Sequence, residues 1–296
     1  MKILVAYDGS MCADTAIDDL QWAGLPQNAH AIVLTVVEER IPAPRSYGMV
    51  ETDFSRDWTE QVAAAERCAE IACNRLYGYF PQCNLQLEAL TGNPATVILH
   101  KANAWPADLV VVGVHGRSRL ERVVLGSVSL KLVREAPCSV RVGRASKHDG
   151  PIRLLIGNDG STEADAAVSE VCGRSWPAGT EARVFGVLEA LTPVNAEPIA
   201  IGQGPFRKIN EQERHLLKSA AEQSVEKLQR AGLAVSSVIE EGNPKEALVE
   251  GARNWNADTI FVGARGLGRV ERILLGSVSS ATVAHAPCTV EVVRRR

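Results

Sequence analysis

Aromatic side chains and long apolar runs are scarce in this 296-residue sequence. Only 5% of the residues are Phe, Trp or Tyr although 46% are hydrophobic, so the core must be built mainly from Ala, Val, Leu and Ile. No apolar run is long enough to cross a bilayer, and the first one, before Asp8, is too short for a signal peptide. The sequence therefore predicts a cytoplasmic protein that does not associate with membranes.

An excess of positive charge and paired cysteines are also missing. The formal net charge is −3 and the isoelectric point is about 6.1, which provides no basic surface for a phosphate backbone and excludes a nucleic-acid partner. The seven cysteines form no C-x-x-C pair and have no neighbouring histidine at the spacing of a zinc site. We expect reduced thiols and no metal ligands.

A repeat runs through the whole chain. Residues 113–140 return as residues 263–290, and residues 2–10 return as residues 153–161. Two copies at so long a period are two domains rather than a solenoid. The boundary lies in a polar segment that ends with Gly and Pro, so we predict one domain over residues 1–143 and a second over residues 151–296.

Short apolar runs alternate with helical patterns in each copy. In the first copy, the expected strands cover residues 3–6, 32–37, 85–89, 109–112 and 139–142, and the expected helices lie near residues 11–23, 58–76, 95–104 and after residue 126. The long helix of the second copy is expected at residues 211–230. This order predicts an α/β protein with two tandem domains of the flavodoxin or Rossmann type, each a mainly parallel sheet with helices on both faces. Residues 40–57 and 190–209 are rich in Pro and Gly, and we expect them to be irregular surface loops.

The loops after the first and fourth strands carry the candidate site, because ligands of open parallel sheets bind beyond the carboxyl ends of the strands. Asp8 and Asp159 follow the two first strands, and a G-x-x-G-x9-G-S-V-S pattern follows each fourth strand. The candidate residues of this pattern are Gly113, Gly116, Gly126, Ser127, Val128 and Ser129 in the first copy and Gly263, Gly266, Gly276, Ser277, Val278 and Ser279 in the second.

These residue types suit an anionic ligand. Gly113 and Gly116 would allow a positive φ and a close approach of the backbone to the ligand. Ser127 or Ser129 would cap the following helix, whose first-turn amides attract anions. We infer a ribose near Gly113, phosphates near Gly116 and the helix start, and Asp8 facing an adenosine hydroxyl or base edge. Each feature alone is also typical of an ordinary turn between a strand and a helix.

The two motifs resemble those of the universal stress proteins, whose nucleotide-binding members carry G-x-x-G-x9-G-[ST]. The resemblance covers essentially the whole chain, up to the closing A-P-C-x-V segment of each copy. It implies a parallel sheet in the order 3-2-1-4-5, ATP as the ligand with or without Mg²⁺, and adenine packed on Val36 and Val187. It also implies that residues 139–142 pair with residues 289–293 as a pseudo-dimer within the chain, and a further homodimer is plausible.

Two positions depart from the family pattern in the second copy. Asn158 stands in place of Tyr7, and Gly263-Ala-Arg-Gly266 stands where G-S-H-G is more usual.

The leading hypothesis is a cytoplasmic stress-response protein that binds ATP as a nucleotide-dependent regulatory module. The sequence has no G-x-x-x-x-G-K-[ST] motif, so we assign no catalytic residue and expect at most slow ATP hydrolysis. One alternative is a protein that acts through protein–protein contacts without a nucleotide. Another is an ATP pyrophosphatase, against which the loop Asp8-Gly9-Ser10 argues, because that class resembles this fold but carries Ser-Gly-Gly-x-Asp-Ser there.

Overall fold

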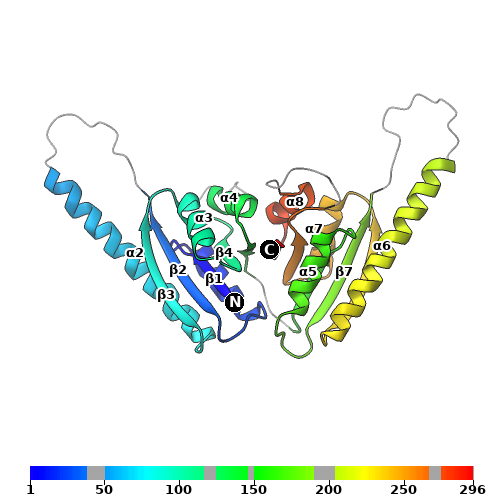
Figure 1. Ribbon diagram of the computed structural model, residues 1–296, viewed down its shortest axis with the longest axis horizontal. Helices are drawn as coiled ribbons and strands as arrows, with labels where there is room; N and C mark the ends of the chain where they lie inside the picture. The colour runs from blue at the N-terminus through cyan, green and yellow to red at the C-terminus, as the bar shows by residue number, and fades with distance from the viewer. Residues whose placement is uncertain (39–50, 117–124, 146–149, 190–203, 267–274, 296) are drawn as a thin grey trace, which may run out of the picture. The chain divides into compact units, whose positions relative to one another are not determined.

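The chain forms two α/β units that repeat the same order of elements (Figure 1). The computed structural model describes residues 1–38, 51–116, 125–145, 150–189, 204–266 and 275–295. The first unit covers Met1–Ala145 and the second covers Ser146–Arg295. The break between the units falls in the polar segment that separates the two sequence copies.

The first unit consists of strands that alternate with helices. Its strands are β1 (Lys2–Ala6), β2 (His30–Val37), β3 (Asn84–Thr91), β4 (Leu109–Gly113) and β5 (Ser139–Gly143). Its helices are α1 (Met11–Asp19), the 3₁₀-helix η1 (Leu20–Trp22), α2 (Glu51–Tyr79), α3 (Pro94–Ala104) and α4 (Ser127–Glu135). The expected helix at residues 11–23 is therefore an α-helix that tightens into a 3₁₀ turn at its end.

The second unit repeats this order. Its strands are β6 (Arg153–Gly157), β7 (Glu181–Leu188), β8 (Ala234–Glu241), β9 (Thr259–Gly263) and β10 (Thr289–Val293). Its helices are α5 (Thr162–Cys172), α6 (Gly204–Arg230), α7 (Pro244–Asn254) and α8 (Ser277–His285).

Each unit has a parallel sheet in which the first and fourth strands are neighbours. The order is β3-β2-β1-β4-β5 in the first unit and β8-β7-β6-β9-β10 in the second, which confirms the expected order 3-2-1-4-5. Ile3 lies opposite Leu109 and Val5 opposite Val111. In the first unit, α1 and α2 cover one face of the sheet and α3 and α4 cover the other (Figure 1). The fold class predicted from the alternation of strands and helices is confirmed.

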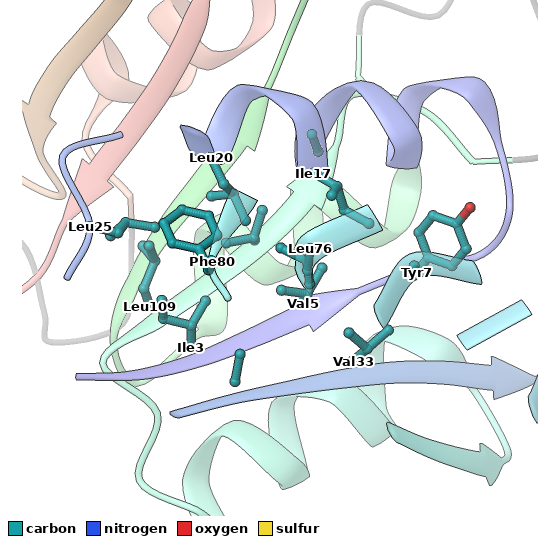
Figure 2. Packing of buried hydrophobic residues seen from close by; sticks show 14 of the residues in the cluster. Ile3, Val5, Tyr7, Ile17, Leu20, Leu25, Val33, Leu76, Phe80 and Leu109 are labelled. Atoms are coloured by element: carbon teal, nitrogen blue, oxygen red, sulfur yellow. The ribbon is translucent and has the colours of Figure 1, made fainter. Parts of the chain in front are cut away.

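The apolar pattern accounts for the packing of the elements. β4 is buried along its whole length, as expected for a central strand with helices on both faces. On α2 the buried side chains recur every three or four residues, at Ala65, Ala69, Ala72 and Leu76. Ala69, Ala72 and Leu76 belong to a core cluster with Val5, Ile17 and other side chains between the sheet and the helices. Figure 2 shows Leu76 close to Val5 in this cluster.

Two expected loops are shorter than predicted. The segments 51–57 and 204–209 are helical, because they form the first turns of α2 and α6. In the predicted loop 40–57, all the Pro and Gly residues lie before the first residue of α2. In the predicted loop 190–209, Pro205 lies in the first turn of α6, where it removes no helical hydrogen bond. The expectation for residues 40–50 and 190–203 lies outside the described residues.

Candidate functional site

The candidate site lies where the carboxyl ends of β1 and β4 meet. The loop after β1 holds Asp8, and the loop after β4 holds Gly116. A Cβ placed on Gly116 would lie 2.8 Å from Oδ2 of Asp8, and a Cβ on Gly266 would lie 2.4 Å from Oδ2 of Asp159. Any side chain at these two positions would collide with the carboxylate, so the structure brings the acidic residue and the second glycine of the motif together in both units.

The Asp8 carboxylate is held by its own loop. Its Oδ1 accepts a hydrogen bond of 3.0 Å from the backbone N–H of Ser10, and the hydroxyl of Ser10 in turn accepts one of 3.2 Å from the N–H of Ala13 and so caps α1. Gly9 between them has a φ of 76°, a conformation that glycine adopts at no steric cost. The side chain of Asp8 is therefore fixed at the tip of the first strand.

The second unit builds the same loop. Asp159 Oδ1 accepts a hydrogen bond of 2.9 Å from the N–H of Ser161, whose hydroxyl accepts one of 3.1 Å from Ala164. Gly160 has a φ of 79°. Sequence reasoning missed the left-handed role of Gly9 and Gly160, although the D-G-S turn in each copy is a known signal for it.

The third glycine of each motif joins the two loops to a helix start. The N–H of Gly126 donates a hydrogen bond of 2.8 Å to the carbonyl oxygen of Val114, and a Cβ on Gly126 would lie 3.4 Å from the Cα of His115. The N–H of Gly276 makes the equivalent bond to Ala264, also 2.8 Å. Residues 117–124 and 267–274, which link the second and third glycines, lie outside the described residues.

The prediction of a positive φ at Gly113 and Gly116 is wrong, since neither residue adopts one. A Cβ on Gly113 would lie 2.7 Å from the backbone carbonyl of Cys12, and a Cβ on Gly263 would lie 2.7 Å from Glu163. Glycine is thus required at the end of β4 by the close approach of α1, and at the end of β9 by the close approach of α5. A ribose contact at Gly113 stays a prediction.

The prediction that Ser127 or Ser129 caps α4 is also wrong. The N-cap is Gly126, with no side-chain cap bond, because the helix already begins at Ser127. Ser129 is buried, and its hydroxyl donates a hydrogen bond of 2.7 Å to the carbonyl oxygen of Gly113. Ser279 makes the same bond to Gly263 at 2.6 Å, so both hydroxyls hold the end of the neighbouring strand.

The first turn of α4 leaves backbone donors available. The earliest bond inside the helix runs from Leu130 N–H to Gly126, and within the described residues the amides of Ser127, Val128 and Ser129 have no acceptor. The same holds for Ser277, Val278 and Ser279, where the first bond starts at Ser280. Such N–H groups, together with the positive end of the helix dipole, form an anion site.

The residues expected to contact adenine lie on the second strands. Val36 and Val187 are half-buried, opposite Leu90 of β3 and Glu240 of β8 in the register of the sheet. Both valines lie near the carboxyl end of their strand, and Asp8 and Asp159 follow the carboxyl ends of the neighbouring strands β1 and β6. Their contact with a base stays a prediction.

The two units differ directly behind the first-strand loop. Tyr7 is buried, and its hydroxyl donates a hydrogen bond of 2.7 Å to Oδ1 of Asp14. Burial, followed by the hydrogen bond to Asp14, raises the pKa of Tyr7 well above its usual range. Its side chain lies at the end of the core cluster in Figure 2. The second unit has Asn158 there, which donates to Ser224 Oγ at 2.8 Å and accepts from the N–H of Gly160, also at 2.8 Å.

Among the described residues no group of three or more His, Cys, Asp and Glu could hold a metal ion. In the same part of the chain, no helix has the length and apolarity that a membrane span requires.

Comparisons with known proteins place the chain in a family. Residues 1–144 and 152–294 each match the universal stress protein family. A universal stress protein of Mycobacterium tuberculosis is 28% identical over 99% of this chain and 97% of its own length. One of Mycolicibacterium smegmatis is 27% identical over the same shares of both chains. The crystal structure of a universal stress protein from Archaeoglobus fulgidus covers 100% of this chain and 98% of its own, with a TM-score of 0.66 and 21% identity. The chain belongs to the universal stress protein family.

Proposed function

We propose that this member of the family binds ATP at the carboxyl end of each sheet and acts as a nucleotide-dependent regulatory module in a stress response. One observation carries the proposal. In each unit one edge of the sheet holds a carboxylate bound by its own loop, a glycine whose Cβ would lie within 3 Å of that carboxylate, and a helix start whose first amides have no acceptor within the described residues. The resemblance of both motifs to those of nucleotide-binding family members supports adenine nucleotide as the ligand.

Separate groups of residues would contact the phosphates, the adenosine and the base of ATP. The amides of residues 127–129 and 277–279 would hold the phosphates, because they lie at the positive end of a helix and have no acceptor in the described part of the chain. Asp8 and Asp159 would accept from an adenosine hydroxyl or base edge, and Val36 and Val187 would cover the base. Any Mg²⁺ would come with the phosphates of ATP, since no protein cluster is available for it among the described residues.

Binding rather than rapid hydrolysis is the function that these residues support. The sequence lacks the lysine loop of dedicated phosphotransferases, so slow hydrolysis is the most that we expect. The cytoplasmic location, the pseudo-dimer and a further homodimer stay predictions, which cell fractionation and sedimentation would test.

The test counts ATP molecules bound per chain by equilibrium dialysis. The parent chain should bind close to two. Gly116→Val and Gly266→Val should each remove one, because the new side chain would collide with Asp8 or Asp159. Gly78→Ala is the matched control, because a Cβ there would meet nothing within 4 Å.

The outcomes separate the hypotheses. If the folded parent chain binds no ATP, the better hypothesis is a protein that acts through protein–protein contacts without a nucleotide. Release of pyrophosphate with an adenylylated acceptor would favour the pyrophosphatase class.

A further inference from the structure

The second site has a charged pair that the first site lacks. Nη2 of Arg265, in the loop after β9, lies 3.5 Å from Oε1 of Glu163 in the first turn of α5. In the first unit His115 takes the place of Arg265, and Cys12 takes the place of Glu163 against the end of the fourth strand. The two candidate sites therefore differ in charge although their backbones are built alike.

Arg265 lies beside the anion site of its unit. A Cβ placed on Gly276, the N-cap of α8, would lie 3.4 Å from the Cα of Arg265 and 3.7 Å from the N of Gly266. Arg265 thus lies between the first turn of α5, where its guanidinium contacts Glu163, and the first turn of α8, where the amides of residues 277–279 have no acceptor among the described residues.

The guanidinium of Arg265 makes one long contact, which leaves other N–H groups available as donors. Its contact with Glu163 is a single one at 3.5 Å, longer than a good charge-assisted hydrogen bond. The other oxygen of Glu163 accepts a hydrogen bond of 2.8 Å from the hydroxyl of Thr162. The remaining N–H groups of Arg265 have no acceptor within the described residues, and 37% of its side chain is exposed.

We infer that Arg265 is a specificity residue of the second site, which makes that site favour nucleoside triphosphates over nucleosides more strongly than the first site does. A guanidinium presents paired N–H groups that match phosphate oxygens, whereas a neutral imidazole presents one donor and no charge. Glu163 is the carboxylate that the phosphates displace from Arg265. The inference rests on the proposed function, because it assumes that a nucleotide occupies this edge of the sheet.

The experiment measures each site alone in the full-length chain. Gly116→Val closes the first site, and the second site is then titrated with ATP and with adenosine by calorimetry at pH 8, where a histidine with an ordinary pKa is mostly neutral. Arg265→His should lower the affinity for ATP by about tenfold or more, because a charge-assisted contact to phosphate is lost. The affinity for adenosine should stay within about twofold, since no phosphate contact is involved.

Two further variants test the assigned roles. Glu163→Gln should raise the affinity for ATP by about twofold to threefold, because a competing negative charge is removed while the shape is kept. In a chain whose second site is closed by Gly266→Val, His115→Arg should increase the ratio of ATP affinity to adenosine affinity at the first site. If Gly116→Val or Gly266→Val lowers the midpoint of thermal unfolding, ATP is instead titrated into chains in which both sites are open. Arg265→His should then weaken only one of the two binding phases for ATP.

The failures are distinguishable. If the folded parent chain binds neither ATP nor adenosine, the proposed function is wrong. If the parent chain binds ATP and Arg265→His leaves the ratio of ATP affinity to adenosine affinity unchanged, the role of Arg265 is wrong and the proposed function stands. Equal losses of ATP and adenosine binding in Arg265→His would show a structural role and would also overturn the inference.

Discussion

In the first unit Asp19, at the end of α1, binds Arg141 of β5 through a contact of 2.6 Å between Oδ2 and Nε. In the second unit the position of Arg141 in the repeat holds Glu291, and Arg174, which follows α5, binds Glu291 and also Glu170 at 2.9 Å. The strand residue has thus changed the sign of its charge, and a partner of the opposite sign comes from a different position. Arg141 and Glu291 are both fully buried, so each requires a partner.

Two buried positions of the repeat also exchange the sizes of their side chains. Thr35 of β2 returns in the repeat as Gly186 of β7, and the buried helix position Ala65 returns as Leu217. In the second unit the side chain of Leu217 fills the space over Gly186, at 3.1 Å from where its Cβ would be. A larger strand residue goes with a smaller helix residue in one unit, and the reverse holds in the other.

The comparison shows which parts of the repeat could change in pairs and which could not. Buried side chains that face each other can exchange size or charge together, because the volume and the balance of charge around them are then kept. The glycines beside Asp8 and Asp159 have no such partner, since the atoms they face belong to a carboxylate fixed by its own loop.

The largest expected effect comes from breaking a buried ion pair. Arg141→Met should destabilise the first unit by about 3 kcal/mol, because the carboxylate of Asp19 is left in the protein interior without its partner. Combining it with Asp19→Leu should restore much of the loss. Urea denaturation measures both variants. The exposed pair Arg75–Asp18 provides the control, and a loss no greater than that of Arg75→Met would contradict the assignment.

Exchanging the strand residue tests the apolar pair. Gly186→Thr should destabilise the second unit by about 1–3 kcal/mol, because the new side chain overlaps Leu217. The double variant Gly186→Thr with Leu217→Ala puts the residue types of the first unit at both positions and should recover most of that loss, because the smaller helix side chain leaves room for threonine. A double-mutant cycle from urea denaturation gives the coupling, and strict additivity would show that the two side chains do not share the space.

Removing the buried serine hydroxyl should have the same effect in both units. Ser129→Ala and Ser279→Ala should each cost about 1 kcal/mol, because each removes a bond to the carbonyl oxygen of the last residue of the neighbouring strand. Thermal unfolding measures the change. Ser127→Ala, which removes an exposed hydroxyl, should change the midpoint little, and unequal effects of the two buried variants would mean that the units are not equivalent at this point.

The smallest effect expected is a dependence on alkaline pH in the first unit. Because the folded state raises the pKa of Tyr7, the unfolded chain loses this proton first, and the contribution of Tyr7 to stability is present below about pH 10 and falls as the pH rises above it. Asn158 cannot titrate. The drop in unfolding midpoint between pH 8 and pH 10.5 should be smaller in Tyr7→Phe than in the parent chain. Tyr77→Phe, at an exposed position, should leave the drop unchanged; if Tyr7→Phe does the same, the prediction fails.

Periodicity and turn chemistry were sufficient to predict most of the fold. The buried face of α2 follows from residues spaced by three and four, and β4 from an uninterrupted apolar run, because both signals depend only on neighbours along the chain. The predicted starts of α2 and α6 are too late, because Pro and Gly near residues 40–50 and 190–205 do not prevent a helix from beginning directly after them or at the first-turn position of Pro205.

The candidate site was predicted as a set of residues, but their roles depended on contacts between distant segments. Gly113 is a glycine because α1 passes over it, Ser129 binds a strand end rather than capping its helix, and Arg265 meets Glu163 across about a hundred residues of sequence. The amino-acid pattern determines where strands, helices and turns form, since these depend on local geometry and burial. Which side chains face one another across the parallel sheet is decided only when β1 and β4 lie side by side, because that pairing joins loops that are far apart in the chain.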